Sequence, residues 1–273
     1  MKRSMFFVLF LLMGICSAVF ANEDNEGIVN IVDEWKIPPE GFFADYSPDQ
    51  EPFIPENLDR SIIGRDDRVT VNNPSSYPYS AIAYLEVTGK CGCSWTCSGF
   101  MVNKDRLLTA AHCLLCTDHS SWAKYIDFYF GYKNSRNYLY RYDGKWTAWA
   151  GNIFNNRKYT TDDDYGCVKF YKNVGDTTGW FGAHWDMPKS TMESKYLYVA
   201  GYRDSVLRYD SGWIDSVVGN EMYYKMDTVP GNSGGPIFTS DYLAVGINIA
   251  SGGSANIGYR LTDTVRFNLY ELY

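Results

Sequence analysis

The 273-residue chain lacks the features that mark membrane-spanning, helical and repeat proteins. No stretch reaches the ~20 consecutive apolar residues that a spanning helix needs. Long helical periodicity is missing, and no internal repeat occurs at the spacing of solenoids or propellers. The chain also has no Asn-x-Ser/Thr acceptor, because a proline occupies the middle of Asn73-Pro74-Ser75. We therefore expect no N-glycosylation.

Most of the chain has no net charge, although the formal net charge of the full sequence is −7. Residues 22–60 hold eleven acidic residues against only Lys36 and Arg60, together with five of the ten prolines. The acidic balance belongs to this segment, which we interpret as an acidic prosegment, and residues 61–273 are neutral overall. A neutral body lacks the basic surface that a phosphate backbone requires, so we expect no nucleic-acid partner.

The N-terminus has the pattern of a signal peptide. Two basic residues follow Met1, an apolar run covers residues 6–13, and Val19-Phe20-Ala21 is a sequence that signal peptidase accepts. We predict a signal peptide over residues 1–21 and a mature protein that is secreted, extracellular or in a secretory-pathway vesicle, with no membrane attachment. Lipidation of Cys16 is disfavoured, because Met13-Gly14-Ile15 matches that signal poorly.

Short apolar or alternating segments recur from residue 61 onward, separated by Gly, Asn, Asp or Ser turns, and predict an all-β fold. The predicted strands cover residues 81–87, 98–102, 107–109, 126–129, 167–171, 197–200, 223–226, 236–239 and 243–249. In the tail, Val265, Leu269 and Leu272 fall on one helical face behind a Thr262 or Asp263 cap, which predicts a short C-terminal helix. Residues 61–273 are enough for a single unit of two barrels.

Chemistry is first indicated by Gly231-Asn232-Ser233-Gly234-Gly235-Pro236. A serine between glycines, just before an apolar strand, lies on a tight turn where its hydroxyl is exposed and backbone N–H groups converge. By itself, this motif is equally typical of a glycine-rich hairpin without catalytic function.

A histidine and a carboxylate complete the pattern. Thr109-Ala110-Ala111-His112-Cys113 follows a strand, and an imidazole held there can take a serine proton and return it to a leaving amine. Of the three residues in Asp162-Asp163-Asp164, only Asp164 stands directly before the apolar stretch 165–170. We therefore expect Asp164 to orient the imidazole and the other two to be solvated.

These motifs together resemble the trypsin and chymotrypsin family of serine peptidases, whose hallmarks are TAAHC, an Asp before an apolar strand, and GNSGGP in this order. Within the family the chain is most similar to the bacterial glutamyl endopeptidase branch. The matching segments are residues 61–68, 77–79, 179–182 and 226–228. The resemblance covers nearly all of residues 61–273 and implies two six-stranded antiparallel β-barrels with the active site between them.

The resemblance also implies the role of each catalytic residue. Ser233 attacks the scissile carbonyl, His112 moves the proton and Asp164 orients His112. The backbone N–H groups of Gly231 and Ser233 form the oxyanion hole. This assignment predicts a serine endopeptidase that works through an acyl-enzyme intermediate.

The expected partners follow from the same roles. A protein or peptide substrate adds as a strand along Ile249, Ala250 and Ser251, and Thr228 and Asn248 line the pocket for the side chain before the cut. The enzyme is expected to be a monomer made as a zymogen, which an activating protease cuts near Arg60-Ser61.

Three residues depart from the relatives' patterns. Asn232 precedes the nucleophile where digestive enzymes carry the Asp that pairs with the new N-terminus, so that switch cannot operate in its usual form. Asn248 stands where glutamyl endopeptidases have a histidine that helps bind the substrate's glutamate, so we expect weak glutamate preference or none. Asp227 stands where a trypsin holds its specificity Asp, but we expect it to have a structural role.

The cysteines agree with export. Six of the seven remain after the signal peptide is removed, which is an even number in an oxidising compartment. The resemblance implies a disulfide between Cys97 and Cys113. Three pairings remain open for the other four residues, Cys91, Cys93, Cys116 and Cys167.

Three alternatives accompany this assignment. The run His112-Cys113-x-x-Cys116-x-x-His119 contains zinc-ligand types at suitable spacing, but export favours disulfides and His112 has a catalytic role, so we expect no metal and no other cofactor. His119 and His184 are then ordinary surface or loop residues.

A catalytically inactive binding protein on the same fold ranks lower because all three triad residues are present. An α/β ester hydrolase is disfavoured because its Gly-x-Ser-x-Gly motif is missing.

Overall fold

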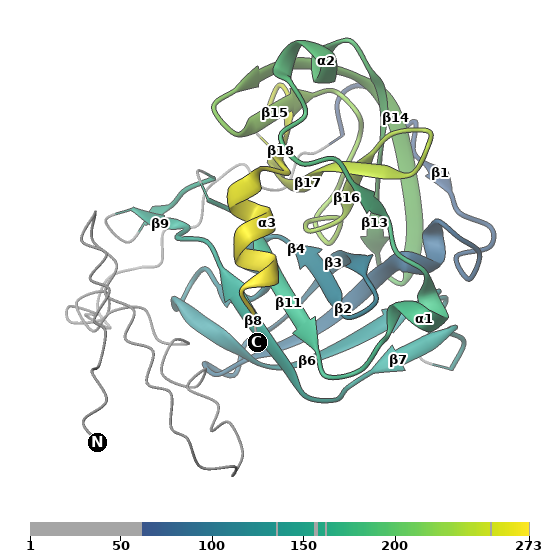
Figure 1. The fold of residues 1–273 in the computed structure, drawn as a ribbon, viewed down its shortest axis with the longest axis vertical. Coiled ribbons are helices and arrows are strands. Elements are labelled where there is room, and N and C mark those ends of the chain that lie inside the picture. The colour runs from purple at the N-terminus through teal and green to yellow at the C-terminus, as the bar shows by residue number, and fades with distance from the viewer. Residues whose placement is uncertain (1–61, 135, 156–157, 162, 252, 273) are drawn as a thin grey trace, which may run out of the picture. The chain divides into compact units, whose positions relative to one another are not determined.

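Strands are the main regular secondary structure of the described chain, and most of them form two large sheets (Figure 1). The computed structural model describes residues 62–273 apart from 135, 156–157, 162, 252 and 273. All of these belong to one compact unit, Val32–Tyr273. The predicted signal peptide, the predicted prosegment and the residue Ser61 lie outside the described residues.

The first sheet is built from the N-terminal half of the described chain, in the order β5-β6-β2-β3-β4-β11-β8, with β7 paired to β6. All of its pairings are antiparallel. Its strands are β2 (Ile82–Gly89), β3 (Ser94–Asn103), β4 (Arg106–Thr109), β5 (Leu115–Cys116), β6 (Ser121–Phe130), β7 (Tyr140–Tyr142), β8 (Trp146–Ala150) and β11 (Gly166–Phe170). The hairpin of β9 (Phe154–Asn155) and β10 (Lys158–Tyr159) stands apart from it.

The second sheet closes on itself. Its order is β1-β14-β13-β16-β17-β18-β15, and the further pairing of β14 with β15 completes a ring of six strands. Its strands are β1 (Val69–Thr70), β12 (Gly182–Ala183), β13 (Tyr196–Arg203), β14 (Val206–Val218), β15 (Glu221–Tyr224), β16 (Pro236–Phe238), β17 (Leu243–Ser251) and β18 (Asn256–Arg260). The short β12 pairs with β17 in parallel, which departs from the predicted all-antiparallel arrangement.

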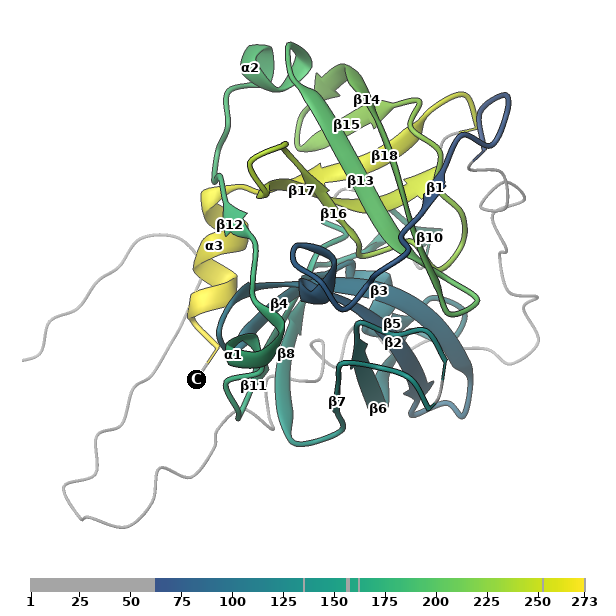
Figure 2. The same cartoon turned by 90° about the vertical axis from the view of Figure 1, so that its right-hand side faces the viewer.

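The barrels lie against each other, as two views at right angles show (Figures 1 and 2). Tyrosines contribute to the contact: Tyr84 and Tyr132 of the first barrel stack with centroids 4.8 Å apart, and the ring of Tyr202 in the second barrel lies 5.6 Å from that of Tyr84. The hydroxyl of buried Tyr202 accepts the N–H of Tyr132 at 3.1 Å. One apolar core therefore continues from the first barrel into the second.

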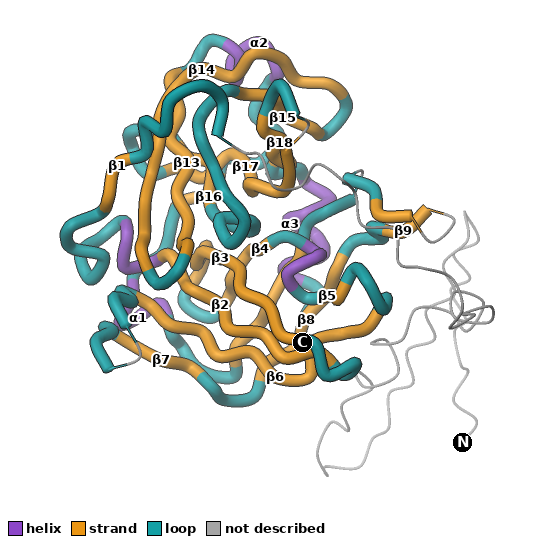
Figure 3. The backbone as a smooth tube through the Cα atoms, turned by 180° about the vertical axis from the view of Figure 1, so that it is seen from behind, coloured by secondary structure: helices purple, strands orange, loops and turns teal. Residues whose placement is uncertain are grey.

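Helices are few and short (Figure 3). They are α1 (Gly175–Thr178), α2 (Lys189–Glu193), α3 (Asp263–Tyr270) and the 3-10 turns η3 (Tyr79–Ala81) and η4 (Ala111–Cys113). The C-terminal helix α3 confirms the sequence prediction: the side chain of Thr262 caps it by accepting the N–H of Val265, and Val265 and Leu269 are buried. Among the residues described, no helix has the length and apolar character needed to cross a bilayer.

All nine predicted strands are strands, with ends that differ by a few residues. The longest strand, β14, was not predicted. Arg208, Asp210, Ser211, Asp215 and other polar residues break its apolar pattern, and pairing with both β13 and β15 supplies the order that its sequence does not indicate.

Candidate active site

His112 lies on η4, directly after β4 of the first barrel. A disulfide joins its neighbour Cys113 to Cys97 of β3, with the two Cα atoms 5.8 Å apart. The indole N–H of Trp95 donates to the Cys113 carbonyl at 3.2 Å. The short turn is thus attached to β3 by a covalent bond and a hydrogen bond, which limits the positions open to His112.

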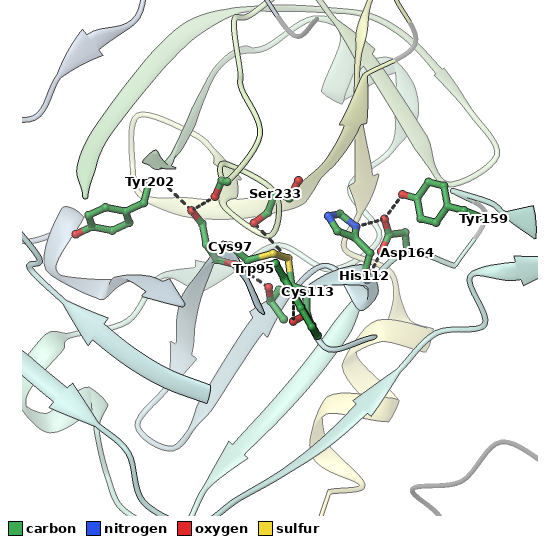
Figure 4. Close-up of a disulfide and its surroundings, with 11 residues drawn as sticks. Trp95, Cys97, His112, Cys113, Tyr159, Asp164, Tyr202 and Ser233 are labelled. Atoms are coloured by element: carbon green, nitrogen blue, oxygen red, sulfur yellow. Dashed lines mark hydrogen bonds and ion pairs between the residues drawn. A yellow bond between two sulfur atoms is a disulfide. The ribbon is translucent and has the colours of Figure 1, made fainter. Parts of the chain in front are cut away.

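Asp164 is fully buried and makes two contacts with His112 (Figure 4). Its Oδ1 accepts the backbone N–H of His112 at 3.0 Å, and its Oδ2 lies 2.7 Å from Nδ1 of the ring. Because a carboxylate only accepts hydrogen bonds, the proton of the neutral ring belongs on Nδ1 and leaves Nε2 as the acceptor. This is the tautomer that a general base needs.

The neighbouring aspartates do not share this position. Asp163 is exposed, and its Oδ1 lies 3.4 Å from the hydroxyl of Tyr259. Asp162 lies outside the described residues. The structure thus brings only Asp164 to His112 among the described members of the Asp run.

Tyr159 is a member of the site that sequence reasoning missed. Its hydroxyl donates to Oδ2 of Asp164, and its ring meets the His112 ring edge to face with centroids 6.0 Å apart. Burial, and then the charge of Asp164, raise the pKa of Tyr159 well above the usual value, so it remains a neutral donor. With 23 tyrosines in the chain, only its place five residues before Asp164 could have suggested this role.

Ser233 is carried by the turn before β16 of the second barrel, and Figure 4 shows it on the side of His112 opposite Asp164. The turn needs glycines: Gly231 and Gly234 have φ of +96° and +83°. A Cβ at position 234 would lie 2.1 Å from the carbonyl oxygen of Ser98. The glycine-rich motif therefore forms a turn that is packed tightly against the first barrel.

Asn232 supports the turn from within. Its Oδ1 accepts the N–H of Val229 at 2.8 Å, and its Nδ2 donates to the carbonyl of Tyr202 at 3.0 Å. The side chain is buried and both its contacts are neutral. Asn232 thus holds the turn without the charged partner that an Asp in this place would require.

Ser98 of β3 connects the nucleophile turn to the first barrel and was also missed. Its backbone N–H donates to the carbonyl of Ser233 at 2.8 Å. Its fully buried hydroxyl donates to the carbonyl of Gly231 and accepts the N–H of Tyr202, both at 2.8 Å. Sequence reasoning assigned Ser98 only to a strand, because no local motif indicates contacts more than 100 residues away.

The amides around Ser233 divide into two groups. The N–H groups of Asn232 and Gly234 donate to Val229 and Asn248 at 2.9 and 2.7 Å. Within the described part of the chain, no hydrogen bond uses the N–H groups of Gly231 or Ser233. These two remain available to a ligand oxygen.

All but one of the residues predicted to contact substrate lie on β17. Strand β16 pairs with β17 only as far as Ile247, so Ile249 and Ala250 continue beyond its edge. Asn248 is buried, and its Oδ1 accepts the hydroxyl of Tyr224 at 2.7 Å. That contact orients the amide and leaves Nδ2 as its remaining donor group. Thr228 is also buried and lies in the loop that follows β15.

Asp227 holds the beginning of the described chain. Its two carboxylate oxygens accept the backbone N–H groups of Ile63 and Asp67 at 2.7 and 3.2 Å. The side chain is buried, and desolvation raises the pKa of Asp227 despite these two donors. These contacts confirm the structural role expected for this residue.

None of the three open cysteine pairings is formed. Cys167 is fully buried, with its sulfur 3.9 Å from the carbonyl of Val265 in α3. Every complete pairing requires Cys167 to reach Cys91, Cys93 or Cys116, which gather elsewhere with His119. His184 is exposed on the surface, as expected.

Comparison with known proteins places this geometry in context. The sequence model of the family described as trypsin-like peptidase domain matches residues 97–247. A glutamyl endopeptidase of Bacillus licheniformis is 29% identical over 233 residues, which cover 77% of this chain and 68% of the relative. An extracellular metalloprotease of Bacillus subtilis is 28% identical over 222 residues with the same coverage. A glutamyl endopeptidase of Staphylococcus aureus is 26% identical over 196 residues, covering 68% of this chain and 51% of the relative.

Solved structures share the fold. The structure of a Glu endopeptidase has a TM-score of 0.66 at 24% identity and covers 77% of this chain and all of its own. The protease Anisep of Arthrobacter nicotinovorans has a TM-score of 0.58 at 20% identity and covers 71% and 95%. The two-barrel arrangement therefore matches that of known proteases.

Proposed function

The chain belongs to the trypsin-like peptidase family and is a serine endopeptidase by that membership, and we propose that it is secreted as a zymogen and cleaves peptide bonds with Ser233, His112 and Asp164. The single observation that carries the catalytic assignment is the pair of hydrogen bonds that Asp164 accepts from the ring and the backbone N–H of His112. A buried carboxylate in this position both selects the ring tautomer and stabilises the imidazolium.

The proposed mechanism gives each of these groups one role. Nε2 of His112 takes the hydroxyl proton of Ser233 as its oxygen attacks the scissile carbonyl. The N–H groups of Gly231 and Ser233 receive the oxyanion. His112 then gives the proton to the leaving amine, and a water molecule releases the acyl group through the same steps.

The substrate backbone adds to β17 beyond the point where β16 ends, at Ile249, Ala250 and Ser251. Thr228 and the Nδ2 group of Asn248 line the pocket for the side chain before the cut. A neutral amide compensates a buried carboxylate less well than a protonated histidine does, so the pocket favours an uncharged side chain over glutamate.

Maturation is tied to the same region. Asp227, next to Thr228, accepts the backbone N–H groups of Ile63 and Asp67, which lie a few residues after the proposed cut between Arg60 and Ser61. Release of the preceding segment thus changes the chain immediately beside the pocket. N-terminal sequencing of the active enzyme should show Ser61, and an N-terminus far from it contradicts this cut.

The test of the function is Ser233→Ala in the matured protein. Hydrolysis of a peptide library should fall on the order of 10⁶-fold, because the remaining groups supply only residual catalysis. The exposed Ser194→Ala serves as the matched control and should keep full activity. Labelling by a fluorophosphonate should be lost only in Ser233→Ala. A wild type that neither cleaves nor labels would instead favour the inactive binding protein.

A further inference from the structure

Four metal-ligating side chains gather away from the catalytic residues. They are Cys91, Cys93, Cys116 and His119, whose ligand atoms all lie within 4.8 Å of one another. The first two are in the turn between β2 and β3, Cys116 ends β5, and His119 is in the turn that leads to β6. Two loops of the first barrel therefore bring three sulfurs and one imidazole together.

The spacing agrees with tetrahedral coordination. Zinc binds sulfur at about 2.3 Å and nitrogen at about 2.0–2.1 Å, so a tetrahedral site separates its N and S ligands by roughly 3.6 Å. Nδ1 of His119 lies 3.3 Å from the sulfur of Cys93 and 3.4 Å from that of Cys116. Cys91 and His119 are exposed, Cys93 is half-buried and Cys116 is buried, so the cluster lies at the surface with one ligand inside.

The backbone of the first loop is shaped for two converging ligands. Gly92, between Cys91 and Cys93, has φ of +89°, and a Cβ there would meet nothing within 4 Å. The N–H of Gly89 donates to the carbonyl of Cys93 at 2.8 Å and closes the turn. The left-handed glycine thus reverses the chain so that both flanking sulfurs reach one place.

Disulfide chemistry does not account for this cluster. Cys97 and Cys113 are already bonded to each other, and Cys167 is buried under α3. The cluster therefore contains three thiols, and one disulfide among them would leave the third without a sulfur partner. A Cys₃His set, in contrast, uses all three sulfurs and the nearby imidazole.

We propose that Cys91, Cys93, Cys116 and His119 bind one Zn²⁺ ion as a structural site. All four coordination positions of the ion would be filled by protein ligands, which is typical of a structural zinc site, whereas a catalytic site keeps one position open. Binding releases the three thiol protons, and the ion with three thiolates carries a net charge of −1. His112 and Cys113, which the sequence run placed among possible ligands, are occupied by Asp164 and Cys97 instead.

The site has a mechanical consequence for the enzyme. Cys116 lies four residues after His112, and Cys113, the last residue of η4, is already bonded to β3. Zinc ties the far end of the same loop to the β2–β3 turn. The histidine loop is then held on both sides, by the disulfide before Leu114 and by the metal after it.

The experiment measures metal content of the full chain purified without chelator. We expect about one zinc ion per chain by elemental mass spectrometry. Replacement by Co²⁺ should give the visible bands of a tetrahedral site and a sulfur-to-cobalt charge-transfer band. His119→Asn removes a direct ligand of the ion. It should therefore weaken zinc binding by more than the roughly 10–100-fold that is typical when a residue hydrogen-bonded to a ligand is lost. The equally exposed His184→Asn is the control and should bind as the wild type does.

A second pair of variants separates ligation from folding. Cys93→Ser should lose zinc as His119→Asn does, whereas Cys167→Ser removes a thiol outside the cluster and should keep it. The proposal is overturned if the purified chain holds no zinc and takes up none, if peptide mapping finds a disulfide within the cluster, or if His119→Asn binds zinc as tightly as the wild type.

Discussion

Replacing Tyr159 with phenylalanine removes one hydrogen-bond donor from Asp164 and keeps the aromatic ring beside His112. The acceptor is a fully buried carboxylate, so the lost bond belongs to the charged class worth about 1.5–3 kcal/mol. For a body of this size, that loss lowers the melting temperature by about 3–12 °C. Tyr159→Phe should therefore be measurably less stable.

The same change should alter the pH dependence of catalysis. Without the Tyr159 hydroxyl, more of the negative charge of Asp164 acts on His112 and stabilises the imidazolium, which is inactive as a base. The acid limb of the kcat/KM profile should therefore move to higher pH. The maximum rate on the plateau should change much less.

Titration of Tyr159 itself does not affect the stability comparison near neutral pH. Because burial raises the pKa of Tyr159 in the fold, the folded protein keeps a proton that the unfolded chain loses near pH 10. The stabilisation from Tyr159 is complete below that pH and is lost as the pH rises through the folded value. The difference in stability between wild type and Tyr159→Phe should thus be constant throughout the neutral range.

Tyr202→Phe is the matched control. It also removes a buried tyrosine hydroxyl, but one that accepts the neutral N–H of Tyr132 and is not in contact with Asp164. It should lower stability by about 0.5–1.5 kcal/mol and leave the acid limb in place. An acid limb that is unchanged in Tyr159→Phe, or one that moves equally in Tyr202→Phe, would refute the role assigned to Tyr159.

Three further predictions concern the turn and the pocket. Ser98→Ala removes two buried hydrogen bonds and should cost about 1–3 kcal/mol in chemical denaturation and lower kcat, whereas unchanged stability would contradict its connecting role. Gly234→Ala places a Cβ 2.1 Å from the Ser98 carbonyl oxygen and should abolish folded, active protein. Its control is Gly253→Ala, where φ is a similar +82° but the space around the new Cβ is open, so the free energy of unfolding should fall by only about 1–2 kcal/mol. Matched peptides with Glu, Gln, Leu or Lys before the cut should show weak glutamate preference or none in the wild type, and a gain of glutamate cleavage in Asn248→His. A strong glutamate preference in the wild type would show that this interpretation of Asn248 is wrong.

The local motifs determined much of this protein from sequence alone. A glycine on each side of Ser233 specifies a tight turn with positive φ, whatever the rest of the chain does. The strands were visible because apolar runs between turn residues depend on near neighbours, and the Thr262 cap and the Val265 face predicted α3 for the same reason. Family membership follows from these motifs in their order.

Only the tertiary structure decided which distant groups meet. Ser98 reaches Tyr202, 104 residues away, and even Tyr159, only five residues before Asp164, meets it through the path of the loop rather than through a motif. The cysteines show the limit most clearly: their spacing left three disulfide pairings open, but the strands bury Cys167 in the core and bring Cys93 to His119. Such contacts depend on strand register and loop path, which are set by the packing of the whole barrel rather than by the residues on either side.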